Sequence, residues 1–279
     1  MCDKVSTVNV TAETSYLVTK SFSSAAQSLC TAKLPAVRSS AEWIAWFTLN
    51  ASRLRPIPWE VGADGLAQNI EAIGPSLRAW QLGETSDGSH LLAAARNYAR
   101  RINDPGFVDA VRLFIAEEQR HGAALGRCLD LAGVSRAQRD WGDSCFRALR
   151  YCWPSMEVWA TPVVMVECHA MIYYQAIRRA TGSPVLRAVC EQILADEVPH
   201  LRFQCERLAI LHRQRAPWLL ALTMLFHRVF FAGITLAVWI AHRRVFQKSG
   251  TYFSRFWRLA WTRMSRCWRQ MSPDRYSWE

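Results

Sequence analysis

The chain has 279 residues, of which 51% are apolar and 20% are charged. This composition excludes a disordered chain, and the length is sufficient to bury a sizeable core. The first residues lack a basic region followed by an apolar run, so we expect a cytoplasmic protein without a secretory signal. None of the nine cysteines forms a Cys-x-x-Cys pair, which argues against a thiolate metal site. Six are expected to be small, buried, unreactive side chains: Cys128, Cys145, Cys152, Cys168, Cys190 and Cys205.

The net charge of +11 is unevenly distributed along the chain. Residues 201–279 hold 14 of the 34 Lys and Arg residues and only three acidic ones, so this part alone carries +11. The first 200 residues are therefore balanced. The basic C-terminal part needs an explanation separate from that of the rest.

The first 64 residues show no sustained periodicity and are interpreted as an irregular N-terminal arm. Within it, Ser40 to Leu54 can form one short amphipathic helix, which is stopped by Pro56 and Pro58. We expect this arm to pack on the helices that follow.

Regular helical signals begin near residue 65. A first helix is predicted from Leu66 to Arg101. Asp104 resembles an N-cap, with Pro105 at the first helical position, for a second helix that ends at Gly133.

A long connection precedes the second pair of helices. The third helix is predicted from Ser155 to Arg179, with Pro162 marking either its true start or a kink. Ser183 and Pro184 open a fourth helix, which reaches Arg213. No run of residues has the pattern of a strand. The sequence therefore predicts an all-α protein, with an antiparallel four-helix bundle over residues 65–214.

Two predicted helices carry the same Glu-x-x-His motif, Glu118/His121 on the second and Glu197/His200 on the fourth. A spacing of three residues places both side chains on one helical face, where they can bind the same metal ion or adjacent ones. About 0.3 such pairs would arise by chance in a chain with this number of Glu and His. Two copies are suggestive but do not decide the matter alone.

The spacing of two further glutamates strengthens this interpretation. Glu84 lies 34 residues before Glu118, and Glu167 lies 30 residues before Glu197. Each interval is long enough for the chain to complete one helix, turn, and come back along the next helix to the same level along the helix axis. The sequence thus holds the pattern Glu…Glu-x-x-His twice, once in each helical hairpin.

Each of these acids falls within an apolar stripe that is expected to face the core. Buried carboxylates cost several kcal/mol unless they are compensated, and two divalent cations balance four of them. The alternative is that such Glu and His residues form buried polar pairs or lie on solvated faces. The shared register favours a two-metal site, and its candidate ligands are Glu84, Glu118, His121, Glu167, Glu197 and His200.

Residues 66–213 resemble the ferritin-like, carboxylate-bridged di-iron superfamily. The segment 117–122, Glu-Glu-Gln-Arg-His-Gly, is similar to the first metal motif of acyl-carrier-protein desaturases, and residues 195–200 to their second. The resemblance implies two iron ions, or a Mn/Fe pair, bridged by Glu118 and Glu197, which would be the catalytic carboxylates. Each motif histidine would bind one ion, and Glu84 and Glu167 would be the lone carboxylates of the hairpins.

The sequence departs from that pattern in two places. Gly83 and Gly88 flank Glu84 and weaken its helix by up to about 1 kcal/mol each relative to alanine. Pro199 lies inside the second motif and removes a helical hydrogen bond, which can kink or bulge that turn.

Other polar residues receive secondary roles. Asp196 is a candidate for orienting a ligand histidine, whereas Glu117 is interpreted as solvated. Tyr174 can donate to a ligand or lie beside a substrate, and packing is the favoured interpretation. Three histidines are treated as structural: His90, His169 and His212.

The C-terminal part, residues 215–279, is predicted to add two helices. Residues 217–241 are apolar apart from His227 and Arg228, and would span a membrane only with Arg228 inside it. Residues 253–271 form a basic amphipathic helix with a tryptophan-rich face. The two interpretations are a cover over the bundle and a peripheral membrane contact through residues 217–271. A nucleic-acid partner is not predicted.

The leading functional hypothesis is a di-iron oxidase or oxygenase that uses O2 and an external electron donor to oxidise a lipophilic substrate. The alternatives are a ferroxidase or iron-handling protein, and a non-enzymatic interaction protein on the same fold. The sequence leaves open whether the chain forms a homodimer. A long apolar tunnel beside Glu167, Met171 and Tyr174 would favour oxidation of an acyl chain, and a short closed cavity would favour metal chemistry alone.

Overall fold

The structure is a computed structural model that describes residues 34–142, 144, 148 and 155–278. The chain divides into two compact units, Met1–Val37 with Asp274–Glu279, and Arg38–Pro273. The larger unit contains the α-helices named below. The described residues are helical and include no strand, as predicted. Both boundaries of the predicted three-part division, at residues 64 and 214, fall inside the larger unit, and that division stays a prediction. Cys145 and Cys152 lie outside the described residues.

The predicted first helix is wrong in one respect, because it is two helices. These are α3 (Ile70–Glu84) and α4 (Ser89–Ile102). Gly88 separates them with a φ of +66°, a conformation that L side chains rarely adopt. A Cβ at this position would also lie 2.5 Å from the side chain of Ile115. The chain therefore breaks directly after Glu84, which becomes the last residue of α3.

The other three helices of the predicted bundle begin and end close to the predicted residues. They are α5 (Gly106–Leu131), α7 (Met156–Ala180) and α8 (Pro184–Arg213). The N-caps of α7 and α8 are serines, whose hydroxyls accept hydrogen bonds from the backbone in the first turn. Two prolines lie inside helices without ending them, Pro162 in α7 and Pro199 in α8.

The predicted cap of the second helix is wrong. Pro105 occupies the N-cap position of α5, and Asp104 accepts a hydrogen bond from Ser40 instead, with 2.5 Å between Oδ2 and Oγ. The predicted C-terminal glycine is confirmed, because Gly133 follows α5 with a φ of +68°.

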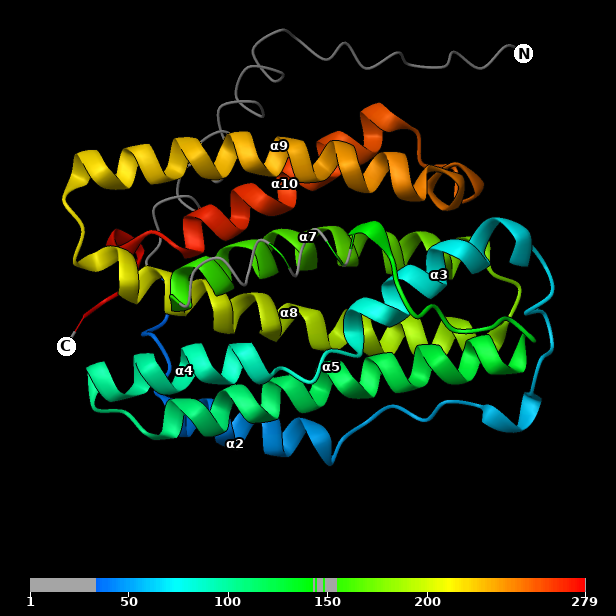
Figure 1. The fold of residues 1–279 in the computed structure, drawn as a ribbon, viewed down its shortest axis with the longest axis horizontal. Helices are drawn as coiled ribbons and strands as arrows, with labels where there is room; N and C mark the ends of the chain where they lie inside the picture. Colours follow the sequence, from blue (N-terminus) through cyan, green and yellow to red (C-terminus); the bar gives the residue numbers. More distant parts are fainter. Residues whose placement is uncertain (1–33, 143, 145–147, 149–154, 279) are drawn as a thin grey trace, which may run out of the picture. The chain divides into compact units, whose positions relative to one another are not determined.

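Four helical segments pack around one core in the order α3–α4, α5, α8 and α7 (Figure 1). The α7–α8 contact is the most extensive, α5 contacts α3, α4 and α8, and α4 reaches α7. Large side chains such as Leu77, Phe107, Leu125 and Tyr173 are fully buried in this core. This packing fixes the positions of the four helical segments along one another, and so the level at which their side chains meet in the core.

The predicted short helix is α2 (Ser40–Ala51), with a capping box between Ser39 and Glu42. It packs on α5 through the buried rings of Trp43 and Phe47. The Trp43 indole N–H also donates to Glu206 Oε2 of α8 over 3.0 Å. These contacts fix α2 beside both helices that carry a Glu-x-x-His motif.

The C-terminal part adds α9 (Pro217–Lys248) and α10 (Phe253–Gln270). Helix α9 contacts α7 and α3, and α10 contacts α7, α8 and α9, so both lie on the opposite side of the core from α2 (Figure 1). Among the described helices, α9 alone is long and apolar enough to cross a membrane. Short 3₁₀ turns occur at Trp59–Val61 and Pro273–Arg275. The described cysteines are buried and form no disulfide.

The close approach of α5 to α3 depends on Gly122. A Cβ there would lie 2.8 Å from the Thr85 side chain and 3.1 Å from the Glu84 carbonyl group. Since backbone atoms cannot give way easily, we expect Gly122→Ala to lower the free energy of unfolding by about 1–3 kcal/mol. Chemical denaturation followed by circular dichroism measures this loss.

Gly126→Ala on the same helix is the matched control. Its added methyl group would meet the flexible guanidinium of Arg136, which can move aside. Alanine raises helix propensity by up to about 1 kcal/mol, so this variant should be as stable as the unmodified protein or more stable. Equal losses in both variants would contradict a specific α3–α5 constraint.

Candidate metal centre

The structure brings the six predicted ligands together inside the helical core. Glu84 comes from the end of α3, and two motif pairs come from α5 and α8, with Glu167 on α7 between them. Their side-chain ligand atoms form two groups, in each of which all atoms lie within 4.8 Å of one another. One group is Glu84, Glu118 and His121; the other is Glu118, Glu167, Glu197 and His200. Glu118 belongs to both, so it is placed to bridge two ions.

Several buried ligand atoms of this site have no hydrogen-bond partner among the described residues. Buried atoms of Glu118, His121, Glu167, Glu197 and His200 make no hydrogen bond, including both oxygens of Glu167. His200 Nδ1 and Glu118 Oε1 lie 2.7 Å apart, but their orientation is not that of a hydrogen bond. Buried polar groups are nearly always paired, and each unpaired group costs about 1–3 kcal/mol. Cations bound between these atoms would satisfy them, so the residues fit a metal centre.

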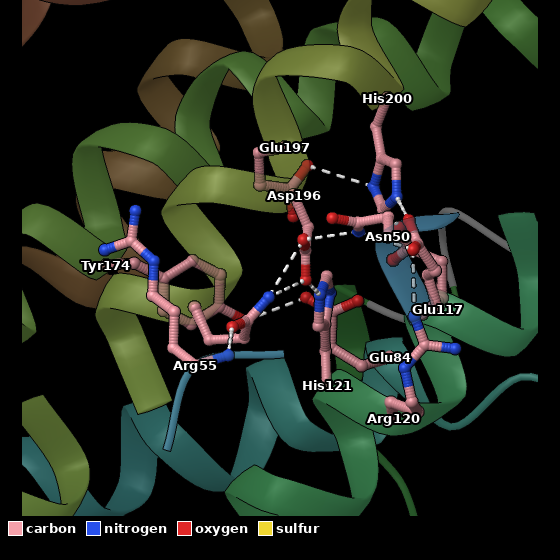
Figure 2. Close-up of polar contacts among 12 residues, drawn as sticks. Asn50, Arg55, Glu84, Glu117, Arg120, His121, Tyr174, Asp196, Glu197 and His200 are labelled. Carbon is pink, nitrogen blue, oxygen red and sulfur yellow. Dashed lines mark hydrogen bonds and ion pairs between the residues drawn. The ribbon is translucent and has the colours of Figure 1, made fainter. Parts of the chain in front are cut away.

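Each motif histidine is held by a carboxylate from the opposite helix (Figure 2). His121 Nε2 lies 3.0 Å from Asp196 Oδ2, and His200 Nε2 lies 2.8 Å from Glu117 Oε2. These pairs leave Nδ1 of both rings buried and without a hydrogen-bond partner among the described residues, so each Nδ1 is available to a metal ion. A carboxylate on the far nitrogen fixes the ring orientation and raises its basicity as a ligand.

The interpretation of Glu117 as a solvated residue is wrong. Its side chain is 1% exposed and pairs with His200, in the same way that Asp196 pairs with His121. The acidic residue before each motif glutamate therefore serves the histidine of the other motif. The repeated order acid-Glu-x-x-His, present in both segments, is the signal that could have indicated this exchange.

Helix α2 closes this side of the centre through Asn50 (Figure 2). The Asn50 amide donates to Glu117 Oε1 over 2.6 Å and to Asp196 Oδ1 over 2.9 Å. Gln192 donates to both oxygens of Asp196, and Arg120 forms an ion pair with Glu117. Sequence reasoning missed all three residues, since nothing in their local pattern distinguishes them from surface amides and cations.

Tyr174 contacts a ligand, which is the less favoured of its two predicted roles. Its hydroxyl donates to Glu84 Oε1 over 2.7 Å, and its ring is fully buried beside Trp80. This bond fixes the side chain at the end of α3, where the helix itself no longer constrains the chain. Glu84 is thus held in the site by Tyr174 on α7.

Burial and mutual repulsion favour the protonated form of several carboxyl groups in this centre. Burial, together with the neighbouring carboxylates, raises the pKa of Glu84 and Glu167 well above the usual range and also raises that of Glu197. Burial opposes ionisation of Glu118 too, but the adjacent His200 outweighs it and lowers the pKa to about 2. The surrounding carboxylates overcome burial at His200 and raise its pKa well above the usual range. Binding two cations must therefore displace protons.

The structural role of two other histidines is supported by their contacts. His169 is fully buried, and its ring nitrogens lie 2.7 Å from the Met165 carbonyl oxygen and 3.0 Å from Thr235 Oγ1. His212 Nδ1 lies 3.2 Å from the Met271 carbonyl oxygen, and Nε2 lies 3.5 Å from Glu157. Neither imidazole enters the metal centre.

A cavity of about 660 Å³ adjoins the centre. Four of the candidate ligands line it, namely Glu84, Glu118, Glu167 and Glu197. The remaining lining is mainly apolar and comes from α3, α4, α5, α7, α9 and residues 140–142. It extends past Trp159 and Val163 instead of along Met171 and Tyr174, which are not among the lining residues. The arrangement can therefore hold an apolar molecule next to bound metal.

The chain matches no known family model, and no curated protein or solved structure is significantly similar to it. The resemblance to the ferritin-like superfamily therefore rests on the motifs and on the geometry of the centre.

The two ligand groups lead to different expectations for single substitutions. Since Glu118 is shared, Glu118→Ala should lose both ions, whereas Glu84→Ala should lose one and keep the other. Metal analysis after anaerobic loading with Fe(II) or Mn(II) and desalting measures the stoichiometry. Asp109→Ala, which removes an exposed acid on the same helix, is the control and should keep two ions. Two ions retained by Glu118→Ala would refute this ligand set.

Metal loading should release protons and weaken as the pH falls. The raised pKa values keep Glu84, Glu167 and Glu197 protonated at pH values where an ordinary glutamate is charged. Metal binds only the deprotonated forms, so the apparent affinity is lost below the raised pKa values and recovers above them. Mn(II) titration calorimetry in buffers of different ionisation enthalpy counts the protons. Binding at neutral pH without proton release would contradict this account.

Proposed function

We propose that the chain is a ferritin-like di-metal oxidase or oxygenase that uses O2 to oxidise a lipophilic organic substrate. The observation that carries this proposal is the cavity, because one mainly apolar chamber contains four candidate ligands and is lined by residues of α3, α4, α5, α7, α8 and α9. Two iron ions held by the six ligands would supply the reductive activation of O2. Mn/Fe is the alternative metal pair.

The protein's own residues would position the reaction and exclude water. Glu118, common to both ligand groups, would hold the two ions at a fixed separation. The pairs His121–Asp196 and His200–Glu117 would keep the imidazoles oriented while ligands around them rearrange. Burial of the site strengthens these electrostatic interactions, since few solvent dipoles oppose them.

The apolar chamber favours an organic substrate over iron handling alone. A ferroxidase needs a path for hydrated ions. In this chamber the candidate glutamate ligands are instead surrounded by apolar side chains, namely Phe114, Trp159, Val163 and Val166. A non-enzymatic interaction protein would have no need for several unpaired, buried ligand atoms in one place. The chain would receive electrons from an external donor, as none of its motifs binds a flavin or an iron–sulfur cluster.

The substrate role of the chamber can be separated from metal binding by filling it. Ala237 lines the cavity from α9, away from the ligand-bearing helices. We expect Ala237→Phe to keep two ions per chain but to lose most oxidation of a medium-chain fatty acid or its ester. Iron-loaded protein, a chemical reductant and O2 would be incubated with this probe, and oxidised products would be identified by mass spectrometry.

Ala221→Phe on the exposed side of the same helix is the control and should keep full product formation. Rapid Fe(II) oxidation without any organic product, unchanged in Ala237→Phe, would instead support the ferroxidase alternative. Fewer than one bound ion per chain would support the non-enzymatic one.

A further inference from the structure

The outward face of α9 is a continuous apolar stripe. Its members recur at steps of three, four and seven residues, so they share one side of the helix. Several are more than half exposed, with Trp218 and Val229 at 67% and Ile240 at 62%. Monomeric soluble proteins seldom expose apolar side chains in such a contiguous patch. We call this surface the α9 stripe: Trp218, Leu222, Leu225, Val229, Leu236 and Ile240.

The opposite face of α9 is committed to the helical core, so the helix lies along α7. Phe231 and Thr235 are fully buried, and Thr235 Oγ1 lies 3.0 Å from His169 Nε2 of α7. Val245 and Phe246, nearer the end of the helix, are fully buried as well. Crossing a bilayer would strip all these contacts away. The stripe is therefore suited to lying against a surface and not to spanning a membrane.

Arg228, the one charged residue between residues 217 and 241, points away from the centre of the stripe. Arg228 lies at the edge of the stripe, and its guanidinium stands 5.6 Å from the ring centroid of Trp268 on α10. A cation over an indole ring retains favourable electrostatics beside apolar surroundings. Arg228 thus leaves the centre of the α9 stripe uncharged.

Helix α10 presents charge beside this apolar surface. Its tryptophan-rich face, for which the sequence left open a cover over the bundle and a membrane contact, turns inward, with Trp261 5.6 Å and Trp268 5.9 Å from the Phe231 ring. Its exposed positions are mainly arginines at helical spacing, which we call the α10 arginines: Arg255, Arg258, Arg266 and Arg269. Two helices that pack against each other thus expose an apolar stripe on one and a row of arginines on the other.

We propose that the α9 stripe and the α10 arginines together dock on the surface of an anionic lipid bilayer. Apolar side chains would enter the acyl region, and arginines would meet lipid phosphates. The charge pattern selects this partner, because residues 201–279 carry the whole net charge of +11. A second copy of the chain would bring the same positive charge to a symmetric interface and be repelled.

The docked face would also supply the cavity, an extension that rests on the proposed function. Ile234, Ala237, Val238 and Ala241 of α9 line the chamber, and Ala241 is exposed beside Ile240 of the stripe. One face of α9 would thus contact the bilayer, and the opposite face lines the chamber. A lipophilic molecule could pass around its edge from the membrane to the metal ligands without crossing water.

Vesicle co-sedimentation of the metal-free, full-length protein tests docking independently of any activity. Vesicles of equimolar phosphatidylglycerol and phosphatidylcholine should bind it, and phosphatidylcholine alone should bind it at least about tenfold more weakly. The triple variant Leu222→Glu/Leu225→Glu/Val229→Glu should lose binding to the mixed vesicles by more than about tenfold. Replacing the four α10 arginines by glutamine should have a similar effect.

The matched control places the same charge on exposed apolar residues elsewhere, as Leu49→Glu/Leu54→Glu/Ile102→Glu, and should bind like the unmodified protein. Because all substituted side chains are exposed, circular dichroism should report equal folding. Equal vesicle binding by both triple variants would overturn the docking surface. So would a vesicle-independent dimer in sedimentation velocity that the stripe variant abolishes.

Failure of docking and failure of the proposed function give different results. If the protein binds vesicles but oxidises no probe, the surface stands and the oxygenase proposal falls. If the protein oxidises a detergent-dispersed fatty ester but does not bind vesicles, the oxygenase proposal stands and the docking surface is refuted. When both are correct, the stripe variant should keep the activity on the dispersed ester and lose it selectively for the same ester embedded in mixed vesicles.

Discussion

The burial of several carboxyl groups in one dry region is the constraint on which the helical core depends. Glu84, Glu167 and Glu197 are almost fully buried, and uncompensated carboxylates there would cost several kcal/mol each. The raised pKa values of these three carboxyl groups indicate that protons can provide this compensation, and bound cations would replace the protons. The exchanged pairs between α5 and α8 add a second condition. A shift of one helix along the other would break both histidine–carboxylate pairs at once.

Helical periodicity explains why the ligand register could be predicted from the sequence. Residues three apart share a face, and the spacing within each hairpin brings Glu84 to the level of Glu118 and Glu167 to the level of Glu197. That Glu118 and Glu197 lie together depends on how the two hairpins pack, which the structure shows. The ends of α7 and α8 were predictable because serine caps and Pro184 act within one turn. The break after Glu84 was not. The contact between Gly88 and the side chain of Ile115, which only the folded chain creates, explains why a residue with a Cβ would not fit there.

The roles of Glu117 and Asn50 illustrate a second limit. Glu117 lies about 100° around the helix from Glu118, so the sequence assigned it to the outside of a four-helix bundle. That assignment omitted α2, which covers this side of α5 and buries the carboxylate. Asn50 then bridges Glu117 and Asp196 from a helix that carries no metal motif. Residues that act through packing of a separate segment leave no periodic signature around themselves.

The apolar content of α9 likewise has no single meaning until its partners are known. The same residues could form a core helix, a membrane span or a surface helix, and hydropathy treats the three alike. The burial of Phe231 and Thr235 on one face and the exposure of the stripe on the other are the observations from which the docking proposal chooses a surface helix. Apolar side chains left in water add nothing to stability. Because α9 also lines the chamber beside the candidate ligands, its outer face would, under the proposed function, control how substrate arrives, whereas metal affinity would depend on the core helices.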